Sequence, residues 1–304
     1  MSEKVKIALV FSLICTIWGS TWLAIRIGLE SLSPLYASGF RFILASLLIF
    51  IWMRFKKIKL QTDKISFRFY ILMGLFTFII PFAFIYWAEQ FVPSGLASVL
   101  FAVYPFFVVI FSYYLIPSET IGISKLTGVI IGFAGILIIF WNDLGGNLTS
   151  YLLGMFAIVI GGILQAGIAV SIKRYGQHLN PFTMNFVPMT IAGFSLLILG
   201  IFMEDFNSLK FNADAVLSII YLGLFGSIIT FTSYFWLLKR VNVILLSLMA
   251  FITPIIALIL GWLVYNEQLT AQHFWGSMLV LTGLLWANTG GFTRLKNKRL
   301  IKPV

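Results

Sequence analysis

The chain has 304 residues, of which 60% are apolar and only 10% are charged, and its mean hydropathy is +1.01. This composition excludes a soluble globular protein and identifies a membrane protein. The net charge of +11 would suggest nucleic acid as the partner of a soluble protein, but here it has to be interpreted from its distribution between the loops.

Apolar stretches of about 20 residues, the length of a helix that crosses a hydrocarbon core about 30 Å thick, recur along the whole chain. They predict an all-α polytopic fold with ten transmembrane helices over residues 7–28, 35–53, 69–88, 96–116, 126–141, 151–172, 182–202, 215–238, 243–264 and 274–289. The first stretch lacks a small-x-small cleavage site and contains Trp18, Trp22 and Arg26. We therefore expect it to stay as a helix rather than be removed as a signal peptide.

The basic residues gather in alternate loops. If the N-terminus is cytoplasmic, 18 of the 21 lysines and arginines fall in cytoplasmic segments, including a basic tail from residue 291. The opposite side collects the carboxylates of Glu30, Glu89, Asp143, Glu204, Asp205, Asp214 and Glu267. Cytoplasmic loops of membrane proteins are rich in Lys and Arg, so both termini are expected in the cytoplasm, with the tail lying against anionic lipid.

The second half of the chain repeats the first. At an offset of 149 residues, the segment Gly74-Leu75-Phe76 and the residues Trp87, Ser98 and Pro105 align with Gly223-Leu224-Phe225, Trp236, Ser247 and Pro254. At an offset of 148, Glu119, Gly128 and Gly135 align with Glu267, Gly276 and Gly283. These matches indicate a duplication, with residues 1–145 as the first repeat and 146–304 as the second. Five helices per half make the repeat inverted, an architecture typical of secondary transporters that alternate access about a midplane site.

Two stretches resemble the EamA family of the drug/metabolite transporter (DMT) superfamily. In the stretch WGSTWLAIRIGLESLSPLYASGFRFILASLLI, the similar features are the Trp-Gly-Ser of the first helix, the Ser-Pro turn and the Arg-Phe of the second helix. In the stretch LASVLFAVYPFFVVIFSYYLIPSETIGISKLTGVIIGFAGILII, the similar features are the proline, the loop glutamate and the glycine-spaced fifth helix. The resemblance covers residues 5–290 and implies an exporter of amino acids, other metabolites or drugs. The second copy departs from the first, since Val187-Pro188 stands where the first has Phe40-Arg41.

The sequence has no signature of an enzyme. The two histidines, His178 and His273, lie at loop edges, and no metal-ligand cluster, P-loop or dinucleotide-binding glycine pattern occurs. We therefore expect no catalysis, cofactor or metal, and Cys15, the only cysteine, excludes an intramolecular disulfide. Without a nucleotide site, uphill transport would need an ion or exchange gradient.

Pro105 and Pro254 lie near the centres of the predicted fourth and ninth helices, at matched repeat positions. Proline removes an amide donor and clashes with the preceding turn, so each can bend its helix and free a carbonyl. Paired interruptions of this kind point to the binding region and to a hinge or gate. The alternative is a static kink.

Polar and aromatic side chains at mid-depth are the candidates for substrate binding. Trp18 and Gln165 occupy matched positions there, where a glutamine is costly unless it finds a partner or a wet cavity. An aromatic and hydroxyl lining would suit an amphipathic solute, and it would be supplied by Trp22, Tyr86, Tyr104, Ser227, Thr230 and Tyr234. The alternatives are packing for the aromatic residues and an interhelical hydrogen bond for Gln165.

Arg41 lies about 9 Å into the predicted second helix, toward the positive end of the helix dipole. A charge at a helix centre costs about 2.5–3.5 kcal/mol, less away from the midplane, so we expect a partner such as Glu89, Glu30 or a carboxylate of the solute. The alternative to a substrate contact is a structural pair or a snorkelling side chain. Because a guanidinium binds carboxylates bidentately, an amino-acid-like solute is a hypothesis.

These observations predict a secondary transporter that exports small metabolites, amino-acid-like or amphipathic, across the bacterial inner membrane by alternating access. Its expected partners are a small-molecule solute and the lipid bilayer, with no nucleic acid, and the oligomeric state stays open. The runner-up is an importer or exchanger of sugar-type or phosphorylated solutes, and the non-transport alternative is a receptor or assembly protein. No carboxylate is predicted at mid-depth, so protons as the coupling ion would depend on Glu89, and facilitated diffusion is equally open.

Overall fold

The computed structural model describes residues 2–116, 123–144, 149–247, 249–268 and 270–298, and all regular elements among them are helices. The first half contains α1 (Glu3–Leu29), α2 (Pro34–Phe55), α3 (Lys64–Met73), η1 (Gly74–Ile79), α4 (Ile80–Ala88), α5 (Ser94–Phe101), α6 (Tyr104–Leu115) and α7 (Ile123–Leu144). The second contains α8 (Ser150–Tyr175), α9 (Thr183–Met203), η2 (Phe206–Ser208), α10 (Ala213–Gly223), η3 (Leu224–Ile229), α11 (Thr230–Arg240), α12 (Val243–Leu246), α13 (Met249–Tyr265) and α14 (Ala271–Lys298). The all-helical prediction is confirmed for these residues.

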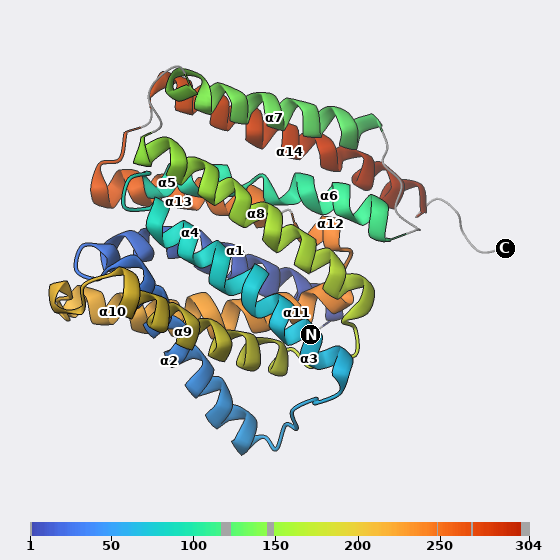
Figure 1. Ribbon diagram of the computed structural model, residues 1–304. Coiled ribbons are helices and arrows are strands. Elements are labelled where there is room, and N and C mark those ends of the chain that lie inside the picture. The colour runs from blue at the N-terminus through green and yellow to red at the C-terminus, as the bar shows by residue number, and fades with distance from the viewer. Residues whose placement is uncertain (1, 117–122, 145–148, 248, 269, 299–304) are drawn as a thin grey trace.

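Seven helical segments in the described part of the chain are long and apolar enough to cross a membrane. They are Glu3–Leu29, Pro34–Phe55, Lys64–Ala88, Ser94–Leu115, Ser150–Tyr175, Thr183–Met203 and Ala213–Arg240, and shorter apolar helices cover Leu126–Ile139 and Ile252–Tyr265. Each of the ten predicted stretches overlaps one or more helices of the structure. The helices run side by side along one common direction, so the bundle has two ends at which the loops gather (Figure 1).

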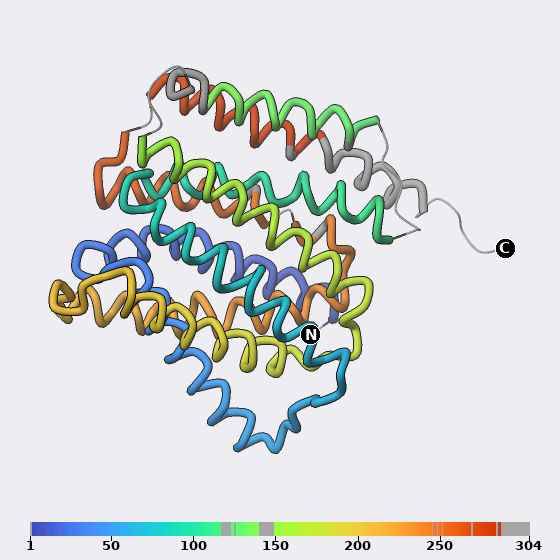
Figure 2. Tube along the Cα trace, in the orientation of Figure 1, coloured from blue at the N-terminus to red at the C-terminus, as the bar shows by residue number. Residues whose placement is uncertain are grey.

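Helices from the two halves of the chain are interleaved in the bundle (Figure 2). Helix α2 packs against α9, and α7 packs against α14. Helix α1 packs against α13, α10 and α11, while α8 packs against α6, α5 and α4. The core therefore lies between the halves rather than within either of them.

The α7 and α14 helices approach so closely that their backbones touch. A methyl group at Gly135 would lie 2.6 Å from the carbonyl oxygen of Gly276, and one at Gly283 would lie 2.6 Å from the carbonyl oxygen of Gly128. Small residues permit this approach between apolar helices in a membrane, where packing rather than burial from water holds helices together. The glycines that align between the two halves thus form one helix contact.

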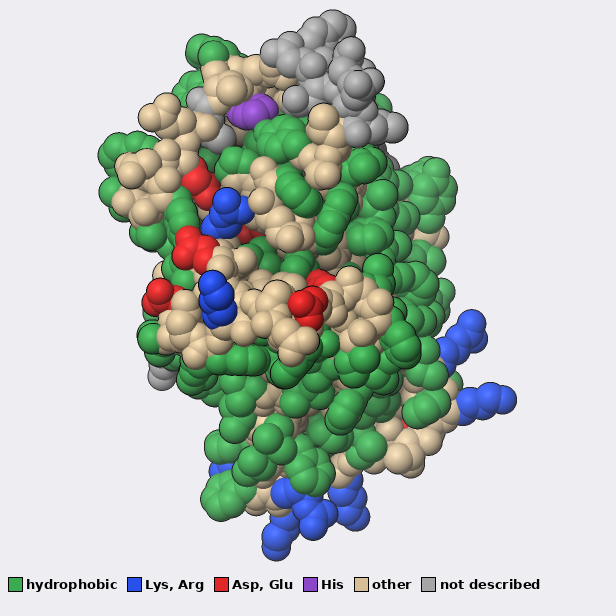
Figure 3. All heavy atoms as spheres, turned by 60° about the vertical axis from the view of Figure 1, so that its left-hand side comes forward, with side chains coloured by type: hydrophobic (Ala, Val, Ile, Leu, Met, Phe, Trp, Pro, Cys, Tyr) green, Lys and Arg blue, Asp and Glu red, His purple; other side chains and the backbone are tan. Residues whose placement is uncertain are grey.

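The two ends of the bundle differ in charge. The acidic end, at the left of Figure 1 and turned forward in Figure 3, carries Glu30, Glu89, Glu204, Asp205, Asp214 and Glu267. Here the Glu204 carboxylate accepts hydrogen bonds from the backbone N–H groups of Leu35 (2.9 Å) and Tyr36 (3.3 Å), at the N-terminus of α2. That placement is favourable because a helix N-terminus attracts an anion.

At the opposite, basic end, lysines bind the carbonyls that helix C-termini leave free. The Lys173 ammonium donates to the carbonyls of Leu238 (2.6 Å) and Val241 (2.8 Å). A cation at this position complements the helix dipole. The tail beyond residue 298 and Glu119 lie outside the described residues.

Candidate functional site

A cavity of about 100 Å³ lies between the halves, which is room for several molecules of water size or one small solute. Six of the predicted substrate-binding residues line it, namely Trp18, Trp22, Arg41, Tyr104, Gln165 and Tyr234. They come from α1, α2, α6, α8 and α11. The remaining three, Tyr86, Ser227 and Thr230, lie behind the lining, in contact with Arg41 or with its partner.

Aromatic rings form one wall of the cavity. The ring of Trp18 lies 5.2 Å from that of Phe231 and 5.5 Å from that of Tyr234, measured between centroids. The hydroxyl oxygens of Tyr104 and Tyr234 lie 2.6 Å apart, within hydrogen-bonding distance. This bond joins α6 of the first half to α11 of the second. The wall thus offers an apolar surface with two hydroxyls, a lining suited to a solute that is partly polar.

Arg41 is only 1% exposed and reaches the cavity from α2. Its Nε donates to Ser227 Oγ (2.9 Å), one terminal nitrogen donates to the Tyr86 hydroxyl (3.3 Å), and the other donates to the carbonyl of Gly226 (3.0 Å). The ring of Phe82 covers one face of the guanidinium, 4.7 Å from its carbon atom to the ring centroid. Neutral acceptors and a π-face hold the cation.

The carboxylate partner expected for Arg41 inside the protein is not seen. Among the residues that the structure describes, neither Glu30 nor Glu89 forms an ion pair with Arg41, and the Glu30 carboxylate instead accepts from the Tyr265 hydroxyl (2.5 Å). A guanidinium has five N–H groups, and three of those of Arg41 bind protein acceptors. Two N–H groups on the terminal nitrogens therefore have no protein partner within the described chain.

Two π-helical segments lie beside the cavity, and the sequence reasoning missed both. In η1, the carbonyl of Thr77 cannot receive the usual α-helical hydrogen bond, because Pro81 has no N–H. The side chain of Gln165 donates to that carbonyl instead (3.1 Å). The interhelical hydrogen bond that was the alternative for Gln165 is therefore present, and the same side chain also lines the cavity.

The equivalent carbonyl of η3 is that of Gly226, which aligns with Thr77 at the offset of 149. The N–H of Thr230 bonds to the Phe225 and Ser227 carbonyls rather than to Gly226. The Gly226 carbonyl accepts from Arg41 and from the Thr230 hydroxyl (2.8 Å). Segments of π-helix often occur at functional sites, since the wider turn leaves backbone groups available.

Both predicted hinge prolines lie near helix interruptions that border the cavity. In the first half, α5 ends at Phe101 and α6 begins at Tyr104, just before Pro105. In the second half, α12 ends at Leu246 and α13 begins at Met249, whereas Pro254 lies inside α13. The residues that flank both interruptions line the cavity, namely Phe101, Tyr104, Leu246, Ser247 and Met249.

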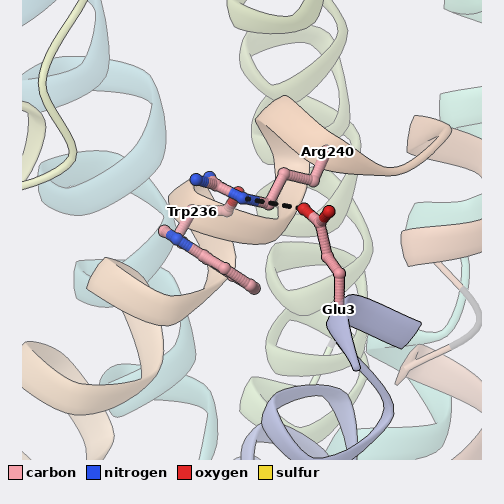
Figure 4. Close-up of polar contacts among 3 residues, drawn as sticks. All are labelled: Glu3, Trp236 and Arg240. Carbon is pink, nitrogen blue, oxygen red and sulfur yellow. Dashed lines mark hydrogen bonds and ion pairs between the residues drawn. The ribbon is translucent and has the colours of Figure 1, made fainter. Parts of the chain in front are cut away.

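A weak contact at the basic end also joins the two halves. Figure 4 shows Arg240 lying over the ring of Trp236, 4.1 Å from its centroid, with its Nε 3.9 Å from Glu3 Oε1. The side chains of Arg240 and Glu3 are 38% and 72% exposed. Exposed ion pairs of this kind contribute little to stability.

The side chains around the cavity determine what it could bind. No group of three or more His, Cys, Asp or Glu side chains in the described ranges could hold a metal ion. A fixed cation with free donors, two hydroxyls and an aromatic wall can bind a solute that carries an anionic or strongly polar group beside an apolar part.

Comparison with known proteins places these features in a family. The model of the EamA-like transporter family matches the chain twice, over residues 5–141 and 152–289. The uncharacterized transporter YoaV of Bacillus subtilis is 30% identical, with 96% of this chain and 99% of the relative covered. The uncharacterized inner membrane transporter YedA of Escherichia coli K12 is 33% identical, with 95% and 92% covered. A solved crystal structure, 17% identical, shares the fold with a TM-score of 0.71 over 98% of this chain and 99% of its own.

Proposed function

The chain belongs to the EamA-like transporter family, and from this premise we propose that it exports small amino-acid-like or amphipathic metabolites across the bacterial inner membrane. It is a multi-pass cell-membrane protein, since its apolar helices are long enough to span a bilayer and its relatives include inner membrane transporters. Its family and relatives are transporters rather than enzymes.

Arg41 is the single observation that carries the proposed solute class. It is the only Lys or Arg among the described residues that line the cavity, and two of its N–H groups have no protein partner. A carboxylate would satisfy both of these donors. A phosphorylated solute would favour several basic residues at the cavity, so import or exchange of such solutes is the second choice.

The proposal includes the architecture and the mechanism. The protein has ten transmembrane helices arranged as an inverted repeat, and it works by alternating access. The family model matches each half of the chain once, which supports the duplication. The packing supports it too, because α1 meets α13 of the other half as α8 meets α6 and α5. By the distribution of basic residues the basic end faces the cytoplasm and the acidic end faces outward. Pro105 and Pro254 would act as hinges between the two conformations.

Growth protection by overexpression, measured across toxic amino acids, nucleosides and drugs, would identify the solute class. Flux of the protective solute into proteoliposomes, with Arg41→Gln as the impaired comparison, would then establish transport. Carboxylated solutes are expected to be moved much faster by the wild type than by the variant. A protein that moves no solute in the panel would favour the receptor or assembly alternative. Loss of solute accumulation when the pH gradient is collapsed would show proton coupling, and unchanged accumulation would exclude it.

A further inference from the structure

Glu89 is a buried carboxyl group for which solute binding gives no role. It follows the last residue of the membrane-spanning segment Lys64–Ala88, at the acidic end. Its side chain is 0% exposed, and neither of its carboxylate oxygens has a hydrogen-bond partner in the described part of the chain. Burying an ionised carboxylate without a partner is very costly, whereas burying the neutral acid costs much less.

Four charged or titratable groups lie near enough to Glu89 to interact with it. Arg26 of α1 and Arg41 of α2 act as cations, Glu267 lies beyond the end of α13, and Tyr86 stands on its own helix. The Arg26 guanidinium donates to the main-chain carbonyl of Glu89 rather than to its carboxylate. The terminal nitrogens of Arg41 donate to the Tyr86 hydroxyl and to the Gly226 carbonyl of η3. Neither cation therefore pairs with the Glu89 carboxylate.

Glu267, in contrast, has hydrogen-bond donors for both of its carboxylate oxygens. It accepts hydrogen bonds from the N–H of Ser94 (2.9 Å), the hydroxyl of Ser94 (2.8 Å) and the N–H of Gly95 (3.0 Å), at the N-terminus of α5. Burial, followed by the negative charge of Glu267, raises the pKa of Glu89 well above its ordinary value, and the attraction of Arg26 and Arg41 offsets this only in part.

The contacts around Glu89 are those that alternating access has to break. Arg26 joins α1 to the end of α4, Glu267 joins the end of α13 to α5, and the Glu30 carboxylate joins α1 to Tyr265 of α13. The last two bonds cross between the halves of the chain. Parting the helices at the acidic end would admit water to Glu89, and water stabilises the ionised form.

We propose that the Glu89 carboxyl is a proton-binding site that is occupied while the acidic end is closed and empties when that end opens. This inference rests on the alternating-access part of the proposed function. The closed state binds one proton more than the open state, so linkage makes protons favour closure. Acidic medium outside the cell therefore keeps the acidic end shut, and a rise in external pH opens it.

Thiol labelling tests this without knowledge of the solute. In a Cys15→Ala background, Ile25→Cys places a thiol on the cavity side of α1, and Asn207→Cys places one on the exposed acidic surface as a reference. A membrane-impermeant thiol reagent is applied to the outer face of right-side-out vesicles. Dividing the Ile25→Cys rate by the Asn207→Cys rate corrects for the pH dependence of an ordinary exposed thiol and of the reagent.

The normalised rate is expected to rise by at least about tenfold from about pH 6 to about pH 8, because one linked proton gives up to about tenfold per pH unit. Adding Glu89→Gln, which mimics the protonated acid, should give a low rate that does not change with pH. Adding Asp214→Asn, which removes an exposed carboxylate of the same end, should leave the wild-type pH response in place. A wild-type rate that ignores pH, or a Glu89→Gln rate that still follows it, would overturn the proposal.

Two further measurements guard against a variant that fails to fold. Glu89→Asp keeps a titratable carboxyl and should keep a pH response with a shifted midpoint. An infrared carbonyl band of a buried protonated acid should be present in the wild type at neutral pH and absent from Glu89→Gln, and an unchanged band would contradict the inference. Solute flux does not enter these measurements, so a failure to transport would count against the proposed function alone.

Discussion

The two π segments, η1 and η3, lie one in each of the two stretches that match the family model, and they differ in what binds them. Each has a carbonyl that lacks its α-helical donor, at Thr77 and at the aligned Gly226. Gln165 of α8 binds the first and Arg41 of α2 binds the second. Each carbonyl is thus bound by a side chain from the other half of the chain, but a neutral amide serves one and a guanidinium serves the other.

The two donors come from helices that do not correspond in the alignment of the halves, α8 in one case and α2 in the other. Gln165 aligns with Trp18 of the first half, which packs in the aromatic wall, and Arg41 aligns with Pro188, which has neither charge nor amide donor. In both halves, a carbonyl that lacks its helical donor accepts a hydrogen bond from a side chain, as a backbone carbonyl inside a membrane must find a donor within the protein. Only one half adds a charge, so we expect the solute to interact more strongly with the Arg41 side of the cavity.

Removing that charge should give the largest effect. Arg41→Gln is expected to reduce solute flux by about 10- to 150-fold, because a hydrogen bond to a charged group contributes about 1.5–3 kcal/mol. Its thermal stability in detergent should change much less. Arg41→Lys keeps the charge without the planar fork and should fall between the two. Normal flux in Arg41→Gln would mean that the charge has no part in solute passage.

The glycines of α7 and α14 test whether the halves are structurally equivalent away from the cavity. Gly135→Ala and Gly283→Ala each push a methyl group against backbone atoms of the partner helix and should each destabilise the fold by about 1–3 kcal/mol. Gly167→Ala is the control, since its methyl group would meet only the Phe111 side chain, at 3.6 Å. The thermal midpoint of unfolding is measured for all three variants. A large decrease for only one of Gly135→Ala and Gly283→Ala would show that the two halves are not structurally equivalent at this contact.

Gln165→Leu should have a smaller effect than Arg41→Gln. The variant loses one neutral hydrogen bond to the Thr77 carbonyl, about 0.5–1.5 kcal/mol, which predicts a reduction in flux of about 2- to 10-fold. Gln177→Leu, the same change at an exposed position beyond α8, is the matched control and should transport normally. If Gln165→Leu impaired flux more than Arg41→Gln does, the asymmetry between the halves would be the reverse of the one inferred.

The ion pair between Glu3 and Arg240 should matter least. Glu3→Gln is expected to change stability by less than about 0.5 kcal/mol, because both side chains are solvated and salt screens their attraction. The measurement is the thermal midpoint at low and at high salt. A clear loss that disappears at high salt would show that this surface contact helps to hold the halves together.

Helix positions could be predicted well from the sequence, because the thickness of a bilayer dictates the length of each apolar stretch. Residues 7–28 and 35–53, for example, lie within Glu3–Leu29 and Pro34–Phe55. The interruptions could be placed only partly. Pro105 marked the break before α6, whereas the break before α13 comes at a position with no proline, and Pro254 lies inside that helix.

Six of the nine predicted substrate-binding residues line the cavity, since polar and aromatic side chains at mid-depth are costly elsewhere. The acceptors of Arg41 could not be predicted from the sequence, because a carboxylate is the expected partner of a buried guanidinium, whereas the structure supplies a backbone carbonyl and two hydroxyls. Pro81, four residues after Thr77, was the available signal for the π segment. The cavity residue Phe231 carries no such signal, since aromatic residues are 17% of the chain.

The most direct test is whether one point in the cavity can be reached from both faces of the membrane. Ala169 of α8 lines the cavity, so Ala169→Cys in the Cys15→Ala background provides a single thiol there. A membrane-impermeant thiol reagent is applied to right-side-out vesicles and, separately, to inside-out vesicles. Alternating access predicts that the thiol reacts from either face, each reaction blocking the other. A thiol that reacts from one face only, or from neither, would contradict a transport path through this cavity.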